Sequence, residues 1–144
     1  MKTSITLVGT LGVLLALGAA WAAAAEPRDE AVKKAVTAAN AWLALVDEGK
    51  YAESWQAAAE YLKSAVDKED FEKSLKAARK PLGAMKSRKV RSAEYRTSLP
   101  GAPDGEYVVI QYNTSFENKK SAIETVTPML EKDRGWRVSG YYIK

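Results

Sequence analysis

The hydrophobic pattern of this chain changes its period near Gly83, and that change limits the possible folds more than any other feature. Before Gly83, apolar residues recur every three or four positions, which is the spacing of an amphipathic helix. After Gly83, apolar and polar residues alternate, which is typical of strands with one buried face. Helices followed by a run of strands predict an α+β domain in which the sheet packs against the helices.

The first part of the pattern predicts three helices. They cover residues 29–47, 51–66 and about 67–80. Asp29 is a plausible N-cap for the first helix, and Gly49 is a plausible stop. Pro81 cannot continue a helix, so it should end the third one.

The second part predicts four long antiparallel strands in a meander. They cover residues 92–99, 108–116, 122–131 and 136–143. The turn-rich segment 100–105 suits a long hairpin loop between the first two strands. Pro128 has no N–H for a central ladder, so we expect a bulge there that bends the sheet around the helices.

Residues 1–25 have the features of a secretory signal peptide. They contain one cation, Lys2, then an uncharged run, then a tract of small residues that ends before Glu26. We expect cleavage within residues 22–26, which leaves residues 26–144 as a single domain in the periplasm. The alternative is a retained membrane anchor, since the uncharged stretch is nominally long enough to span a bilayer. Without a cysteine there is no acceptor for lipoprotein lipidation, so the cleaved product should have no stable membrane anchor.

The composition excludes several kinds of chemistry. The chain has no histidine and no cysteine, so it lacks an imidazole base, a thiolate nucleophile and the usual zinc ligands. We also find no glycine-rich phosphate loop. We therefore expect no metal and no cofactor, and any catalysis would depend on carboxylates, lysines, tyrosines or hydroxyls.

Charge is distributed unevenly along the chain. Residues 47–72 carry eight acids and three lysines, whereas residues 73–91 carry eight cations and no acid. The second block could bind an anionic partner, and we assign this surface to Lys73, Lys76, Arg79 and Lys80. The plain alternative is that these cations form solvated faces of one helix and one strand. No aromatic residue interrupts the block, which argues against a nucleic-acid partner.

Aromatic and polar residues of the predicted strands suggest a core and a pocket. Trp42, Trp55 and Trp136 lie at helix or strand spacing, so we expect them in the core rather than in a ligand site. The candidate ligand pocket consists of Tyr95, Tyr112, Thr114 and Glu124. Exposure on the outer face of the sheet is the fate we favour for Glu124, and a role as a pocket acid is the alternative.

Four segments resemble one family of exported bacterial proteins, grouped as domain of unknown function 4019. They are AWLALVDEGKYAESW (41–55), KPLGAMKSRK (80–89), TSLPGAPDGEYVVIQYNTSFENKK (97–120) and ETVTPMLEKDRGWRVSGYYIK (124–144). The resemblance covers most of residues 26–144 and implies a small periplasmic module, but it brings no established activity or functional residues. The helix–sheet pattern itself resembles the cone-shaped, cystatin-like fold of nuclear-transport-factor-2-like proteins, in which a bent sheet and its helices enclose a pocket.

Two classes of function fit these observations. We favour a non-catalytic binding module of the cell envelope, whose partner is a protein, an envelope polymer or a small ligand. A homodimer is also compatible with the sequence. The alternative is a cone-fold lyase or isomerase, in which a pocket carboxylate removes a proton and tyrosine hydroxyls stabilise the oxyanion. The two classes differ in whether Glu124 or Asp47 lies in a cavity beside a tyrosine hydroxyl.

Overall fold

The computed structural model describes the backbone of residues 19–144 and the side chains of residues 27–144. Most of the predicted signal peptide lies outside these residues, so its cleavage stays a prediction. Within the described residues, no helix is both long and apolar enough to span a membrane.

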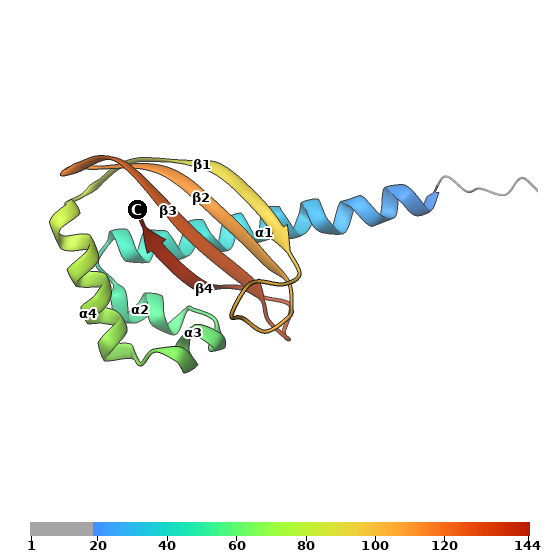
Figure 1. Cartoon of the computed structure of the whole chain (residues 1–144), viewed down its shortest axis with the longest axis horizontal. Helices are drawn as coiled ribbons and strands as arrows, with labels where there is room; N and C mark the ends of the chain where they lie inside the picture. The colour runs from blue at the N-terminus through green and yellow to red at the C-terminus, as the bar shows by residue number, and fades with distance from the viewer. Residues whose placement is uncertain (1–18) are drawn as a thin grey trace, which may run out of the picture.

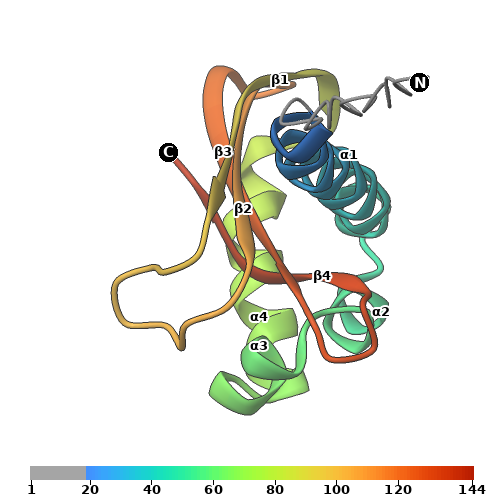
Figure 2. The same cartoon turned by 90° about the vertical axis from the view of Figure 1, so that its right-hand side faces the viewer.

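The fold is α+β, as the sequence predicts, with an open, curved sheet of four antiparallel strands (Figure 1). The strands are β1 (Met85–Arg96), β2 (Tyr107–Phe116), β3 (Lys119–Leu130) and β4 (Trp136–Ile143), and they lie in sequence order. Figure 2 shows the loop between β1 and β2 projecting on the side of the sheet away from α1. The register of β3 and β4 shifts between Thr127 and Pro128, which confirms the predicted irregularity at this proline.

The strand β1 begins seven residues earlier than the sequence predicts. Its pairing with β2 shifts register twice, between Met85 and Ser87 and between Val90 and Ser92. Each shift changes which residues face the core, because successive side chains of a strand alternate between its two faces. The first half of β1 therefore shows no simple alternation that a sequence pattern could reveal.

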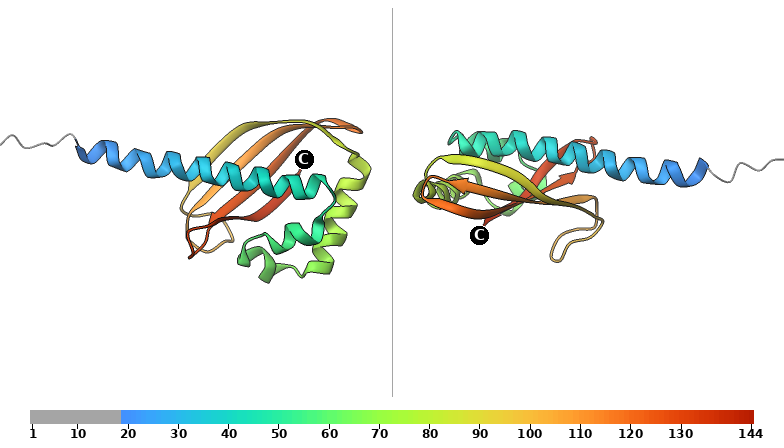
Figure 3. Two further views of the ribbon diagram at one scale, coloured as in Figure 1. Left: turned by 180° about the vertical axis from the view of Figure 1, so that it is seen from behind. Right: turned by 90° about the horizontal axis from the view of Figure 1, so that it is seen from above.

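The long helix α1 (Ala19–Asp47) crosses the inner side of the sheet. Its buried residues include Ala39, Trp42, Leu43 and Val46. Gly49 has φ of 75°, the left-handed backbone that ends helices, and its N–H donates to the carbonyl of Val46. The sequence suggested Asp29 as the N-cap, but the helix starts ten residues earlier, in an alanine-rich segment that favours helix. Asp29 is therefore not an N-cap. Both views in Figure 3 show these first turns extending past the end of the sheet.

The predicted second helix is two short helices, α2 (Tyr51–Gln56) and α3 (Glu60–Ala65). Ala58 and Ala59, which lie between them, are buried, and the Ala59 N–H donates to the carbonyl of Val138 in β4 at 2.9 Å. This hydrogen bond replaces the helical one that an unbroken helix would make. Residues 19–144 therefore form four α-helices rather than three, because the edge of the sheet competes for the backbone at this point.

The helix α4 (Lys68–Arg79) follows the predicted start and end. The side chain of its N-cap, Asp67, accepts a hydrogen bond from the Asp70 N–H at 2.9 Å. Phe71 and Leu75 bury its inner face. A short 3-10 helix, η1 (Lys80–Leu82), then contains Pro81 and leads to Gly83.

The core lies between α1, α4 and the inner face of β2. It contains Val108, Ile110 and Tyr112 of β2 together with Trp42 of α1. The Trp42 indole N–H donates to the carbonyl of Ser54 at 2.8 Å. Trp55 and Trp136 are half-buried and pack against this core, so all three tryptophans contribute to it.

Candidate functional site

A buried carboxylate, Glu124 of β3, lies at the centre of the polar groups in the core. Its side chain has no exposed surface. One oxygen, Oε1, accepts hydrogen bonds from Arg88 Nε at 2.7 Å and from the Thr114 hydroxyl at 2.5 Å. The other, Oε2, accepts from Arg88 Nη2 at 3.2 Å and from the Tyr141 hydroxyl. Both oxygens of Glu124 are therefore fully engaged.

A second carboxylate, Asp47 at the end of α1, shares the same arginine. Arg88 donates from Nη1 to Asp47 Oδ2 at 2.7 Å and from Nη2 to Oδ1 at 2.9 Å. Arg79, the last residue of α4, donates to Asp47 Oδ1 at 2.9 Å. We call these six residues the interior charge network: Asp47, Arg79, Arg88, Thr114, Glu124 and Tyr141. The network joins two helices to all four strands and contains two positive and two negative charges.

Strand register explains why these side chains meet. Arg88 of β1 lies opposite Thr114 of β2, and Thr114 lies opposite Ala122 of β3, two residues before Glu124. Residues two apart on a strand share a face, so Arg88, Thr114 and Glu124 all point to the inner side of the sheet. Asp47, at the end of α1, lies beside them and bonds to Arg88.

The charges of the network stabilise each other. Burial alone would raise the pKa of Asp47, but hydrogen bonds and charge from Arg88 and Arg79 outweigh burial and hold this pKa below its usual value. Burial would lower the pKa of Arg88, but its bonds to Asp47 and Glu124 raise it instead. Burial and the neighbouring Glu124 raise the pKa of Tyr141. Tyr141 is therefore a protonated hydroxyl at neutral pH and donates to Glu124.

Arg79 is the least satisfied member of the network. Arg79 is 5% exposed, and its guanidinium lies over the Phe116 ring, 4.8 Å from the ring centre. Its Nε and Nη1 have no hydrogen-bond partner among the described residues. The interaction with the aromatic ring partly replaces those missing partners.

The predicted pocket residues come together only in part. Glu124 and Thr114 are in direct contact. Tyr112 lies opposite Glu124 in the β2–β3 register, but its hydroxyl donates to the Asn40 side chain at 2.8 Å. Burial, the largest influence, raises the pKa of Tyr112 to about 12. Tyr95 lies farther along β1, where its hydroxyl donates to Glu106 at 2.7 Å.

The expectation that Glu124 is exposed on the outer face was wrong. The residue belongs to the inward set of β3 with Ala122 and Val126, all of them buried. An inward carboxylate is stable here because an arginine and two hydroxyl groups compensate its loss of hydration.

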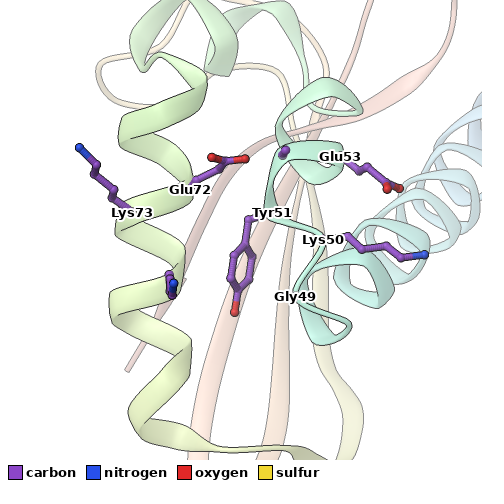
Figure 4. A pocket seen from close by; sticks show the side chains of 8 residues that line it. Gly49, Lys50, Tyr51, Glu53, Glu72 and Lys73 are labelled. Atoms are coloured by element: carbon purple, nitrogen blue, oxygen red, sulfur yellow. The ribbon is translucent and has the colours of Figure 1, made fainter.

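Only part of the predicted basic patch on α4 lies on the surface. Arg79 is buried in the interior charge network, whereas Lys73, Lys76 and Lys80 are exposed. Lys73 and Lys76 line a hollow of about 420 Å³ that Glu72 and Glu53 also line. Figure 4 shows Lys73 pointing away from α2, while Tyr51 lies between the two helices. The surface around α4 therefore carries both signs of charge.

A groove between α4 and β4 is the most apolar hollow near the network. Its volume is about 720 Å³, and Tyr141 belongs to both the groove and the network. Its apolar lining includes the following side chains: Val66, Phe71, Leu75, Ala78, Leu82 and Ile143. The strand β4 is an edge of the sheet, so one wall of the groove is a strand edge and the other is a helix.

The described residues contain no cluster of three or more acidic side chains that could hold a metal ion. Asp47 was a possible acid from its sequence position, whereas Arg88 and Tyr141 were not predicted as members of the network and Arg79 was expected on the surface. A charged residue at an inward position of a strand would have been the signal for Arg88. The two register shifts of β1 hide that signal.

One of three comparisons with known proteins gave a match. Neither the curated proteins nor the solved structures gave a match to this chain. A family model, DUF4019, described as a protein of unknown function, matches residues 38–141. The match includes the whole interior charge network and most of the α4–β4 groove. With more than half of its length matched, the chain belongs to the DUF4019 family.

Proposed function

We propose that this protein is a non-catalytic binding module of the cell envelope and that its ligand lies in the groove between α4 and β4. One observation carries the proposal. The groove has a mainly apolar lining and a volume of about 720 Å³, whereas the acid beside it is fully engaged in the interior charge network. Pockets lined mainly by apolar groups with a few polar ones are typical of ligand sites.

The alternative, a lyase or isomerase, has one observation in its favour. The Tyr141 hydroxyl lies against Glu124, which is the pairing of carboxylate and tyrosine that such a mechanism needs. A general base must have a free lone pair within reach of the substrate proton. Both oxygens of Glu124 already accept two hydrogen bonds each, and Tyr141 gives its proton to Glu124 rather than to an oxyanion. These contacts make a structural role the better explanation of the pair.

The proposed location rests on the sequence. Residues 1–25 have the charge and size pattern of a cleavable signal peptide, and the predicted cleavage window of residues 22–26 falls in the first turns of α1. The remaining domain would then be periplasmic. The curved sheet with α1 across its inner side supports a cone-like, cystatin-like arrangement.

A blocking variant tests the groove. Ala78 lines it, whereas the adjacent Ala77 does not, and both side chains are exposed on α4. The apolar fluorophore N-phenyl-1-naphthylamine serves as the ligand, with binding followed by fluorescence. We expect Ala78→Phe to weaken binding about tenfold, which corresponds to about 1.4 kcal/mol, while Ala77→Phe binds like the wild type. Equal binding by the two variants, or none by the wild type, would contradict the proposal.

The enzyme alternative has its own test. Glu124→Gln removes the candidate base beside Tyr141 but keeps the shape of the side chain. A non-catalytic module should bind N-phenyl-1-naphthylamine in this variant as the wild type does, provided that circular dichroism shows a folded protein. An activity found in the wild type and lost in a folded Glu124→Gln variant would favour the lyase or isomerase.

A further inference from the structure

A second hollow lies on the outer face of the sheet, and its chemistry differs from that of the groove. Its volume is about 620 Å³, and β1, β2 and β3 all contribute to it. Four lysines line it: Lys89, Lys119, Lys120 and Lys144. We call this site the lysine hollow.

The cations of the lysine hollow have no internal partners. Each of the four lysines is exposed, and none of them forms an ion pair with another described residue. No aspartate or glutamate side chain lines the hollow. Like charges held together without counter-charges create a positive potential that attracts an anion.

Beside the apolar Ala122 and Ile123, the rest of the lining includes polar side chains that can form hydrogen bonds. Asn113 and Ser115 of β2 alternate with the buried residues Tyr112 and Thr114, so they face outward. Ser87 and Ser121 also line the hollow, whereas the hydroxyl of Thr114 is engaged with Glu124. The hollow therefore combines four ammonium groups with three hydroxyl groups and one amide.

We propose that the lysine hollow binds a linear anionic polysaccharide. Ammonium groups would pair with its carboxylate or phosphate groups, and the serines and Asn113 would bond to its hydroxyl groups. A flexible polar chain can follow a hollow surface, whereas a planar bilayer fits a flat or convex one. The hollow also contains no aromatic side chain, so it cannot insert a ring at a membrane interface or stack on bases.

This site is distinct from the one in the proposed function. Lys119 and Lys144 border both the lysine hollow and the α4–β4 groove, whereas Lys89 and Lys120 line only the hollow. Changing Lys89 and Lys120 therefore tests the polysaccharide site without altering the groove. The two proposals can fail separately.

The experiment measures binding of fluorescently labelled oligogalacturonate by anisotropy at low ionic strength. The test variant is Lys89→Gln/Lys120→Gln. The control is Lys73→Gln/Lys76→Gln, which removes the same charge from exposed positions on α4, part of the surface to which the sequence analysis assigned an anionic partner. We expect the test variant to bind about fivefold more weakly, which is the order of magnitude for two exposed ion pairs. The control should bind within about twofold of the wild type.

Three further ligands separate the possible partners. Neutral dextran of matched length should not bind, and added salt should weaken oligogalacturonate binding because exposed charges are screened. Vesicles that contain phosphatidylglycerol and a single-stranded oligonucleotide should bind more weakly than oligogalacturonate. Stronger binding to vesicles or to the oligonucleotide would overturn the choice of a polysaccharide. Equal losses in the two double variants, a larger loss in the α4 variant, or no binding by the wild type would overturn the site.

Discussion

Two arginines of the basic segment, residues 73–91, lie in the interior of this fold, whereas the lysines of the segment lie on its surface. The side chains of Arg79 and Arg88 are only 4% and 10% exposed, and they pair with Asp47 and Glu124 in the interior charge network. The lysines of the segment are all exposed: Lys73, Lys76, Lys80, Lys86 and Lys89. The guanidinium of arginine is a planar fork that can hold two carboxylates at once, whereas the lysine ammonium is compact and strongly hydrated.

A run of positive charge in a sequence does not by itself identify a basic surface. A segment without acids looks like one basic surface, but the partners of its arginines lie 32 positions away for Arg79 and 36 and 41 positions away for Arg88. Arg91 shows that residue type alone does not decide the outcome, since it is exposed. The inward position on β1 and the nearby carboxylates decide it for Arg88.

The sharpest test of this comparison removes Arg88. In Arg88→Met, the buried Glu124 keeps only hydroxyl donors, so we expect a loss of about 3–5 kcal/mol in the free energy of unfolding. Arg91→Met on the same strand serves as the control and should change this energy by less than about 0.5 kcal/mol. Urea titration followed by circular dichroism measures both. Similar losses in the two variants would mean that the buried pairs contribute no more than an exposed charge.

A smaller loss is expected for Arg79. Asp47 keeps its two bonds to Arg88 in Arg79→Met, and the change also removes two buried nitrogens that have no partner. We therefore expect a cost of about 1–2 kcal/mol, near that of a hydrogen bond to a charged group. Lys80→Met is the matched control at the neighbouring exposed position. If Arg79→Met were as costly as Arg88→Met, Arg79 would have partners that the structure does not reveal.

The Asp47 carboxylate makes stability depend on pH in the acid range. Its pKa is lowered in the folded protein from an ordinary 3.8, so as the pH falls the unfolded chain takes up the proton first. Asp47 therefore stabilises the fold above about pH 4, and this contribution is lost as the pH falls through its lower, folded pKa. Asp47→Asn should show a smaller loss of unfolding free energy between pH 6 and pH 3.

A second carboxylate, Asp133, would also contribute to the pH dependence of stability, and its contribution must be eliminated. Arg137 lowers the pKa of this exposed carboxylate to about 2, so Asp133 titrates in the same range. Both proteins should therefore carry Asp133→Asn. An unchanged pH dependence after Asp47→Asn in this background would show that Asp47 is not coupled to the arginines.

The smallest effect is expected at the exposed lysines. Lys73→Gln, Lys76→Gln and Lys80→Gln should each change the free energy of unfolding by less than about 0.5 kcal/mol, as for most surface positions. Guanidinium is a salt, so urea is the suitable denaturant for these variants. A loss above about 1 kcal/mol for any of them would place that lysine in a network like that of Arg88.

Much of the fold could be predicted from periodicity alone. The α+β class, the meander of four strands, the end of α1 at Gly49 and the irregularity at Pro128 all follow from local patterns. The break between α2 and α3 could not be predicted, because it depends on a hydrogen bond from Ala59 to β4. That bond exists only after the sheet has formed.

The candidate site was predictable in part. Thr114 and Glu124 were both candidates for one pocket, although exposure was favoured for Glu124, and the structure brings them into contact. Their burial with Arg88 could not be predicted, since it requires the register of β1, which shifts twice. Tyr95 follows the same alternation but lies too far along β1 to reach them.

The position of the interior charge network also has a consequence for the order of folding. Asp47, Arg88 and Glu124 are separated by 41 and 36 residues, and pairs so distant in sequence are costly to form early. They can meet only when the end of α1 and strands β1 and β3 are already in place. Interactions that form after the rate-limiting step slow unfolding without speeding folding. The network would then act chiefly by prolonging the lifetime of the folded state, so its loss should be seen in the rate of unfolding rather than in the rate of folding.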